Sequence, residues 1–229
     1  AFKNRLEQTL AYANLDSLAV LYIDLDHFKT INDTLGFETG NRLLKEVAKR
    51  IHTLLNPEDT ACRLYGDKFV CLIHRMSRQQ ITQLAEHMLK RLAQPVQLDH
   101  VNCIVTPSIG ISLYPQDGKD ADTLLSHAES ALFQLKKEGR NRYCFFSPEM
   151  DINSKRRLLV GNDLHQALPN RQLHVCYQPL VDLKCGAISG TEALLRWEHP
   201  TLGNIPPAEF LPQAEDNGLI TEIGQWVLH

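Results

Sequence analysis

Hydrophobic residues along the first two thirds of the chain alternate between strand-like runs and helical spacings. A near-continuous apolar run covers residues 18–25, which is typical of a strand buried on both faces. Apolar residues recur at helical spacing in residues 41–55, 81–92 and 120–137. Shorter runs predict strands at residues 61–64, 69–73, 96–98, 101–113 and 143–146. This order predicts an α+β fold, in which helices pack against a central sheet.

The pattern changes after Ser147 and Pro148, where we expect the first domain to end. A polar stretch leads into apolar residues at helical spacing, which predicts a linker helix over residues 148–169. The remaining residues read as strand, strand, helix and helix, at 173–183, 187–197, 207–217 and from 221 onward. An amphipathic helix carrying Phe2, Leu6, Leu10 and Ala13 opens the chain, and another helix is still running at its end. We therefore expect a piece of a longer protein: residues 1–147 with a truncated N-terminus, the linker, and a fragment over residues 170–229.

Composition removes several classes of function. The 24 basic and 27 acidic residues are spread along the chain, so no basic face for nucleic acid is predicted. No apolar run approaches 18 residues, so we expect no membrane contact by this segment, although its parent protein could be membrane-anchored. The ten histidines lack zinc-site spacing. The six cysteines lack CxxC spacing and predict reduced core residues of a cytoplasmic protein: Cys62, Cys71, Cys103, Cys144, Cys176 and Cys185.

Carboxylates mark the first candidate site. Asp24 and Asp26 end the buried strand, and Asp67 follows Gly66 at the tip of a predicted hairpin. Two carboxylates brought together in this way can hold Mg²⁺ or Mn²⁺ and position a nucleoside triphosphate. Acidic residues are also common at strand ends and turns that bind nothing. The pattern alone therefore leaves open whether these residues form a metal site. The same holds for a downstream cationic cluster, which suits either phosphates or a helix C-terminus: Lys136, Lys137, Arg140 and Arg142.

Five separated motifs resemble, in order and spacing, the landmarks of the GGDEF (diguanylate cyclase) family over about residues 1–147. They are Asp24-Leu25-Asp26-His27-Phe28-Lys29, Ile31-Asn32-Asp33, Gly36 with Gly40, Arg63-Leu64-Tyr65-Gly66-Asp67-Lys68-Phe69, and Lys136 with Gly139-Arg140-Asn141-Arg142. Several motifs in register are far more specific than any one of them. The resemblance implies a palm-like, nucleotidyl-cyclase-type fold, in which a central antiparallel sheet is flanked by helices.

The resemblance also implies roles for single residues. Asp24 and Asp67 stand at the positions that bind divalent metal. Lys136 and Arg140 stand at those that hold phosphates. Asn32 and Asn41 stand at those that read the guanine edge, where Asn41 replaces the family's Asp. An amide offers guanine one acceptor and two donors, so guanine preference is expected to be weaker.

The signature itself departs from Gly-Gly-Asp-Glu-Phe. Tyr65 puts a ring where the family has a Gly that lets substrate approach the backbone. Lys68 puts a cation at the catalytic position where the family uses Glu at the metal and the reacting hydroxyl. We therefore expect the domain to be inactive as a cyclase. The upstream inhibitory motif, Arg-x-x-Asp in the family, reads Asn56-Pro57-Glu58-Asp59 and lacks its Arg, so product feedback is also doubtful.

Residues 170–229 resemble the opening of an EAL domain. The motifs are Tyr177-Gln178-Pro179, Glu192-Ala193-Leu194 with Arg196-Trp197, His199-Pro200, Pro207 to Phe210, and Ala214-Glu215 through Gly218 to Trp226. The resemblance implies that Glu192 is a catalytic metal ligand, that Arg196 grips a phosphate of cyclic di-GMP and that Gln178 lies nearby. Without it, a surface ion pair at a strand end would be the plainer reading. An EAL domain is a TIM-like barrel whose other carboxylates come from strands beyond these residues.

Two functions remain open at this stage. In the first, a cyclase-inactive GGDEF domain acts as a regulatory or nucleotide-binding module, for GTP or cyclic di-GMP, beside an EAL cyclic-di-GMP phosphodiesterase. In the second, both domains are degenerate and the protein is a non-catalytic cyclic-di-GMP receptor or scaffold. Homodimer contacts through either domain suit both functions. The sensory input, and whether the complete EAL domain is active, are left open.

Overall fold

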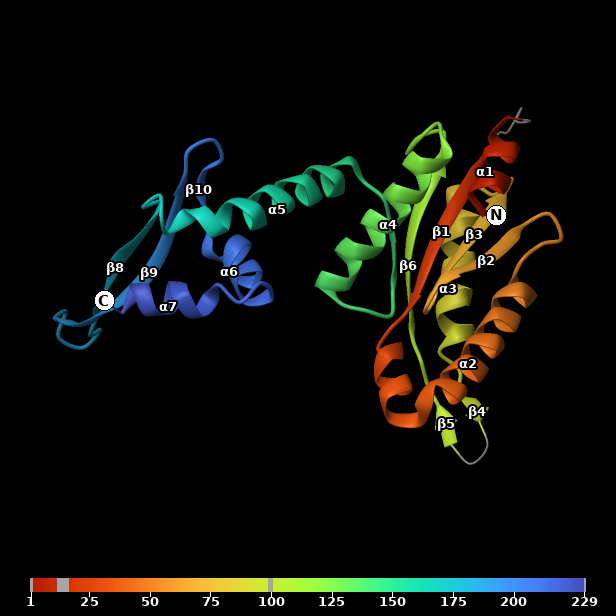
Figure 1. Cartoon of the computed structure of the whole chain (residues 1–229), viewed down its shortest axis with the longest axis horizontal. Helices are drawn as coiled ribbons and strands as arrows, with labels where there is room; N and C mark the ends of the chain where they lie inside the picture. The colour runs from red at the N-terminus through yellow and green to blue at the C-terminus, as the bar shows by residue number, and fades with distance from the viewer. Residues whose placement is uncertain (1, 12–16, 99–100, 229) are drawn as a thin grey trace. The chain divides into compact units, whose positions relative to one another are not determined.

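The computed structural model describes residues 2–11, 17–98 and 101–228, with the side chains of residues 153 and 154 left out (Figure 1). Ala13, which the periodicity assigns to the first helix, lies outside these ranges. The chain divides into two compact units, Ala1–Asp151 and Ile152–His229.

A five-stranded sheet forms the centre of the first unit. Its order is β2 (Thr60–Tyr65), β3 (Lys68–His74), β1 (Leu18–Leu25), β6 (Pro107–Tyr114) and β7 (Tyr143–Phe145). Neighbouring strands are antiparallel except for β6 and β7, which are parallel. The predicted mainly antiparallel sheet, with a hairpin turning at Gly66 and Asp67, is confirmed.

Helices cover both faces of this sheet. On one face, α2 (Phe28–Leu54) and α3 (Arg78–Leu92) pack over the odd-numbered residues of β1. On the other, α1 (Phe2–Ala11) and α4 (Ala121–Glu138) pack over Leu18, Val20 and Tyr22. Every residue of β1 is buried, because side chains from both faces of the strand meet a helix layer. The polar residue Asp24 lies on the α4 side by the same alternation.

Two elements differ from the sequence-based expectation. The helix expected to begin near Asn41 begins at Phe28, and Gly36 interrupts it with φ 83° and ψ 158°. Glycine adopts this positive φ without the clash that a Cβ would cause. The strand expected over residues 101–113 splits into β5 (Val101–Cys103) and β6, because β5 pairs with β4 (Val96–Leu98) in a separate two-stranded sheet whereas β6 pairs with β1.

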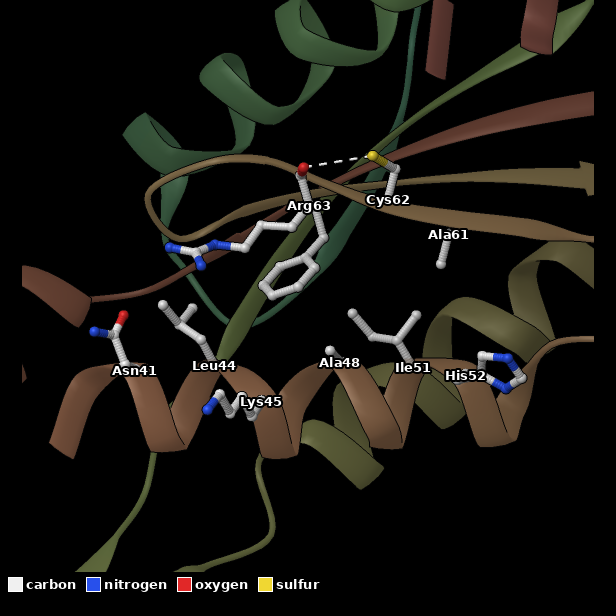
Figure 2. Close-up of a pocket in the computed structure, with 10 residues that line it drawn as sticks. Asn41, Leu44, Lys45, Ala48, Ile51, His52, Ala61, Cys62 and Arg63 are labelled. Atoms are coloured by element: carbon white, nitrogen blue, oxygen red, sulfur yellow. Dashed lines mark hydrogen bonds between the residues drawn. The ribbon is translucent and has the colours of Figure 1, made fainter. Parts of the chain in front are cut away.

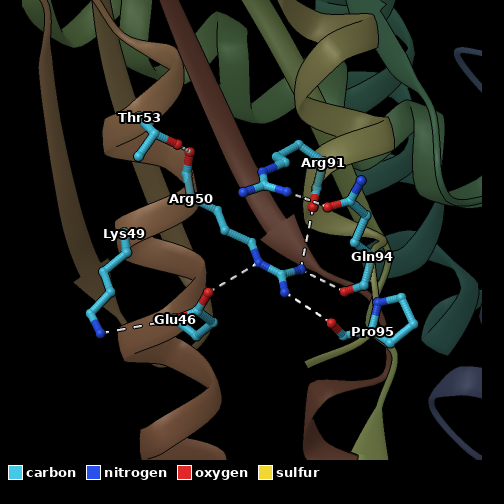
Figure 3. Close-up of polar contacts among 7 residues, drawn as sticks. All are labelled: Glu46, Lys49, Arg50, Thr53, Arg91, Gln94 and Pro95. Carbon is cyan, nitrogen blue, oxygen red and sulfur yellow. Dashed lines mark hydrogen bonds and ion pairs between the residues drawn. The ribbon is translucent and has the colours of Figure 1, made fainter. Parts of the chain in front are cut away.

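Arg50, which is buried in α2, ties that helix to the end of α3 (Figure 3). Its guanidinium donates to Glu46 Oε1 at 3.3 Å and to the carbonyl oxygens of Arg91, Gln94 and Pro95 at 3.3, 2.5 and 3.0 Å. These carbonyls lie where α3 ends and lack helical partners, and a cation is also favoured at that end of a helix dipole.

The second unit combines a three-stranded antiparallel sheet with three helices. The sheet order is β10 (Gly203–Ile205), β9 (Ile188–His199) and β8 (Leu173–Val181). The helices are α5 (Pro148–Ala167), α6 (Pro207–Asp216) and α7 (Ile220–Val227). Val160, Leu164 and Ala167 of α5 are buried in the core of this unit. The helix predicted as a linker therefore packs as part of the second unit from Ile152 onward.

The cysteine prediction is only partly right. All six thiols are free, and Cys71 and Cys103 are buried. Cys176 and Cys185 are exposed, because Cys176 lies on the β8 face away from the core and Cys185 lies in the loop after β8. Cys62 and Cys144 are half-buried. Within the described ranges, no helix is long and apolar enough to cross a membrane.

Candidate functional site

The end of β1 and the signature turn lie side by side. Asp24 is the antiparallel register partner of Lys68, and the Leu25 backbone N–H donates to the carbonyl oxygen of Asp67 at 3.4 Å. The tertiary fold therefore places Asp24 and Asp67 at one edge of the sheet. Burial raises the pKa of the Asp24 carboxyl above its ordinary value, and the charge of Asp67 adds to this rise.

Lys136, from the last turn of α4, forms an ion pair with the Asp24 carboxylate. Its ammonium nitrogen lies 2.5 Å from Asp24 Oδ1. This ion pair lowers the pKa of Asp24 but offsets only part of the effect of burial. Asp24 is 6% exposed, so little of its carboxylate faces solvent. Arg140, the other residue at a phosphate position, is exposed just beyond the end of α4.

Lys68 points toward α4 and two tyrosines. Its ammonium donates to Tyr65 Oη at 3.0 Å and to Glu129 Oε1 at 3.3 Å. The same nitrogen lies 5.7 Å from the ring centre of Tyr22 and 4.9 Å from that of Tyr65. The two phenol oxygens are 3.4 Å apart. We call Lys68, Tyr65, Tyr22 and Glu129 the signature cluster; the sequence shows its members but not that they meet.

The pKa values of the two phenols are shifted in opposite directions, that of Tyr65 by Lys68 and that of Tyr22 by burial. The Lys68 ammonium hydrogen-bonds to Tyr65 and lowers the pKa of that phenol below its usual range. Burial raises the pKa of Tyr22, and the bond to Tyr65 adds to the rise. Tyr65 itself is 59% exposed, so much of its ring lies in solvent at the start of the signature turn.

Asp26, the second carboxylate of the strand end, has a structural role. Its carboxylate accepts hydrogen bonds from Thr106 Oγ1 at 2.8 Å, from Ser108 Oγ at 2.8 Å and from the Asn141 backbone N–H at 3.1 Å. These bonds hold the loop after α4, which contains Arg140, against the end of β1. Asp59, the residue of the upstream motif that is retained, also has a structural role. Its carboxylate accepts hydrogen bonds from the backbone N–H groups of Asn56 and His74.

The residues around Asp24 do not fit a divalent metal. A metal would have to displace Lys136 from Asp24, and Lys68 supplies a second cation directly across the strand. No group of three or more His, Cys, Asp or Glu side chains in the described part of the chain could hold a metal ion. The first site therefore has two carboxylates and two ammonium groups where magnesium prefers several oxygen ligands.

Asn32 carries the clearest sign of a missing partner. Its side-chain oxygen is buried and has no hydrogen-bond partner in the structure. A Cβ built on Gly40 would lie 1.9 Å from that oxygen, so the neighbouring glycine leaves it room. An unsatisfied buried acceptor costs about 1–3 kcal/mol. A ligand with N–H donors, such as the guanine edge, would remove that cost.

Asn41 lies at one end of a groove of about 400 Å³ between α2 and β2 (Figure 2). Apolar side chains form most of its walls: Leu44, Ala48, Ile51, Ala61 and Phe69. Lys45 and Arg63 add positive charge. We did not predict the groove from the sequence. Ala48 on the helix and Ala61 on the strand, both short side chains, are the signal that could have indicated it.

The second candidate site has only its first residues in place. Gln178 and Glu192 are direct cross-strand partners on β8 and β9, and both are exposed. Arg196 lies on the same face of β9 four residues later, about 13 Å along the strand. Its guanidinium donates to the Leu195 carbonyl oxygen rather than pairing with Glu192. Arg196 also lines a shallow cavity of about 510 Å³ near Pro206 and Pro207.

Comparison with protein families assigns both parts of the chain. Residues 1–142 match the family described as "Diguanylate cyclase, GGDEF domain". Residues 161–229 match the family described as "EAL domain".

Curated relatives are named for enzymes of cyclic di-GMP. The chain is 46% identical, over 98% of its length, to the bifunctional diguanylate cyclase/cyclic di-GMP phosphodiesterase MucR of Pseudomonas aeruginosa, of which it covers 33%. It is 40% identical over 92% of its length to the cyclic di-GMP phosphodiesterase NbdA of the same organism, covering 27% of it. It is 34% identical over its whole length to the cyclic di-GMP phosphodiesterase PdeR of Escherichia coli, covering 34%. The chain thus spans about a third of these relatives.

Solved structures match the first unit. The GGDEF domain of PA1120 from Pseudomonas aeruginosa has a TM-score of 0.65 and 32% identity, covering 67% of this chain and 92% of that one. The GGDEF domain of DgcB from Caulobacter crescentus, solved in complex with c-di-GMP, has a TM-score of 0.59 and 25% identity, covering 63% of this chain and 85% of that one.

Proposed function

This chain belongs to the GGDEF diguanylate cyclase family and continues into an EAL domain, and on that premise we propose that its GGDEF domain is a cyclase-inactive regulatory module. The chain has the domain order of GGDEF–EAL proteins of cyclic-di-GMP signalling. In the proposal, the first domain binds a nucleotide without converting it, and the state of that domain sets the activity of an EAL phosphodiesterase.

A single observation carries the loss of cyclase activity: Lys68 stands across from Asp24, while Lys136 pairs with Asp24 at 2.5 Å. Phosphoryl and nucleotidyl transfer depend on cations that neutralise charge developing on the reacting phosphate, and metal ions usually supply this in such sites. Mg²⁺ or Mn²⁺ would reach Asp24 and Asp67 only by displacing Lys136, so its binding here is weak. An ammonium at position 68 also cannot accept the proton of a reacting hydroxyl.

Of the two functions expected of this family, nucleotide binding and cyclase activity, the site supports nucleotide binding. The unpartnered oxygen of Asn32 offers an acceptor to a guanine N–H group, and Asn41 of the same helix lines the groove between α2 and β2. Lys136 and Arg140 lie on the α4 side, where phosphates would have to arrive. GTP is the ligand that this arrangement favours, and Asn41 in place of a carboxylate weakens the preference for guanine.

The EAL part contributes the beginning of a phosphodiesterase site. In the proposal, Glu192 is a metal ligand, Gln178 supports it across the strand pair, and Arg196 binds a phosphate of cyclic di-GMP. A divalent ion there needs carboxylates from further barrel strands, so Glu192 alone does not complete a site. Regulation would pass through α5, because its C-terminal part is buried in the core of the second unit.

The deciding experiment uses a protein in which this chain is followed by a complete EAL domain. Cyclic di-GMP linearisation is measured with Mg²⁺ or Mn²⁺, with and without GTP, in the wild type and in Asn32→Ala. We expect hydrolysis whose rate responds to GTP in the wild type and not in the variant. Synthesis of cyclic di-GMP from GTP by the unaltered protein would refute the proposal.

The alternative is a non-catalytic cyclic-di-GMP receptor or scaffold that signals through dimer contacts. The exposure of Glu192 without an ion-pair partner in the described residues is compatible with it as well. Absence of hydrolysis together with retained binding of cyclic di-GMP would favour this second function.

A further inference from the structure

The sheet of the first unit ends at β2, and the groove between α2 and β2 opens beside this edge. We propose that the edge and the groove together bind an extended, acidic segment of a partner protein, which adds to the sheet as a further strand. The backbone of the segment pairs with β2, and every second side chain enters the groove. This interaction surface goes beyond the proposed nucleotide-binding function.

The backbone of β2 is suited to such pairing. In the described part of the chain, β2 is the first strand of the sheet order and pairs with β3 alone. Alternate N–H and C=O groups of an antiparallel edge strand point away from its neighbour, where another strand can bond to them. The register is regular from Thr60 to Arg63 and shifts before Tyr65, and the strand contains no proline. A partner strand can therefore pair along the regular stretch.

The groove receives side chains from the same edge. Ala61 and Arg63 lie on the α2 face of the sheet, because their register partners Cys71 and Phe69 belong to the core beneath α2. Figure 2 shows both side chains directed toward that helix. Buried apolar side chains form the floor of the groove: Leu44, Ile51 and Phe69. Ala48 on the helix and Ala61 on the strand are exposed and short, so apolar side chains of an added strand fit between them.

Charge selects an acidic partner. The described residues that line the groove include the exposed Lys45 and Arg63 and no acidic side chain. Among the described contacts, Arg63 uses only its Nε–H, which donates to the Gly66 carbonyl oxygen at 2.8 Å, so its terminal nitrogens can reach a carboxylate. A second copy of this chain would bring the same two cations to the interface, and like charges facing each other disfavour association. An acidic segment therefore fits this edge better than a second copy.

The test titrates the whole chain with an acetylated and amidated peptide of sequence Thr-Glu-Thr-Val-Thr-Val-Thr, followed by NMR of the backbone amides. In an extended conformation, its Glu and both Val side chains lie on one face, as the charged end and the apolar middle of the groove require. We expect saturable binding in the micromolar range, with chemical-shift changes centred on residues 60–63. The same peptide with Lys in place of Glu should bind about tenfold more weakly.

Methylation of the peptide backbone separates strand addition from simple filling of the groove. Two further copies of the peptide carry N-methyl groups on alternate amides, one copy on each set. Only alternate amides of an added strand face β2, so one methylated copy should lose binding and the other should keep it. Equal binding by the two copies would overturn the proposal, and so would the lack of saturable binding by the unmodified peptide.

Variants of the protein test the charge. Lys45→Glu should weaken binding of the acidic peptide about tenfold and should favour the Lys-containing peptide. Lys49→Glu is the matched control, because it makes the same charge change one turn further along α2, outside the described lining of the groove. Unchanged affinity in Lys45→Glu would contradict the acidic partner. A dimer of the chain whose formation blocks the peptide would assign this edge to a second copy and overturn the proposal as well.

Discussion

The ammonium nitrogen of Lys136 lies 2.5 Å from Oδ1 of Asp24, so the last turn of α4 closes over the carboxylate at the end of β1. By resemblance to the family, Lys136 was expected to bind phosphate and Asp24 to bind metal. In the structure the lysine instead neutralises the aspartate. Lys68 opposite Asp24 strengthens the effect, because it supplies a second cation at the same strand end.

Restoring the signature should recover metal binding before it recovers synthesis. Lys68→Glu combined with Tyr65→Gly replaces the cation with a carboxylate and removes the ring at the start of the turn, so Mg²⁺-dependent GTP binding should appear. Cyclic di-GMP synthesis should additionally require Asn41→Asp, since one poorly matched buried hydrogen bond costs about 1–3 kcal/mol. Binding and product formation are measured on the single, double and triple variants.

The control for this series is Asp24→Asn in the triple variant, which should abolish the recovered metal dependence. Appreciable synthesis by the unmodified chain would contradict our interpretation of the first domain. An inert triple variant with restored Mg²⁺-dependent binding would separate metal affinity from the dimeric arrangement that synthesis requires.

Tyr65 should ionise at lower pH than an ordinary tyrosine. The Lys68 ammonium stabilises its phenolate, so Lys68→Met should raise the pKa of Tyr65 toward the usual value. Ultraviolet absorbance of the phenolate, followed against pH, measures this, and Tyr65→Phe identifies the titration that belongs to Tyr65. An identical titration curve for the wild type and Lys68→Met would show that the 3.0 Å contact does not persist in solution.

Arg50→Met should destabilise the first unit by about 3 kcal/mol, because it leaves the carbonyl oxygens at the end of α3 without their charged donor. Lys49→Met is the matched control, since the neighbouring side chain is 77% exposed and its substitution should change stability by less than about 0.5 kcal/mol. Urea unfolding followed by circular dichroism compares the two. Equal midpoints would mean that solvent replaces the contacts of Arg50.

Gly40→Ala should weaken GTP binding about tenfold while the fold is retained. Its Cβ would lie 1.9 Å from the Asn32 side-chain oxygen, so Asn32 has to leave the position from which it would meet the base. Gly224→Ala in α7 serves as control, because a Cβ there meets no atom within 4 Å and alanine favours the helix. If Gly40→Ala binds GTP as tightly as the wild type, Asn32 is not the base-reading residue.

The pair between Arg156 and Glu209 should couple α5 to α6 more strongly than the pair between Arg157 and Asp216. Two guanidinium nitrogens of Arg156 reach the Glu209 carboxylate at 2.6 and 3.2 Å, and that carboxylate side chain is 25% exposed. Arg157 reaches Asp216 at 3.2 Å, and the Asp216 side chain is 73% exposed. A bidentate, partly buried pair is expected to contribute about 0.5–1 kcal/mol, and the exposed pair less. Double-mutant cycles to alanine measure both coupling energies, and equal values would contradict the ranking.

Much of the fold follows from local spacing in the sequence. The buried strand over residues 18–25, the hairpin around Gly66 and the helix over residues 120–137 were predictable, because apolar periodicity and turn residues report backbone conformation within a few positions. The family followed from five motifs in register. The change from the family's Glu to Lys68 was also evident from the sequence, since it requires only the residue type at a known motif position.

Tertiary structure alone decided which partners these residues take. Lys136 pairs with Asp24, and Lys68 with Tyr65 and Glu129, because β-sheet register and the placement of α4 over the sheet bring distant segments together. The unpartnered oxygen of Asn32 and the groove beside Asn41 likewise depend on how α2 packs. Local periodicity says which face of an element is apolar, but contacts between side chains far apart in sequence depend on register and helix position, which no local pattern encodes.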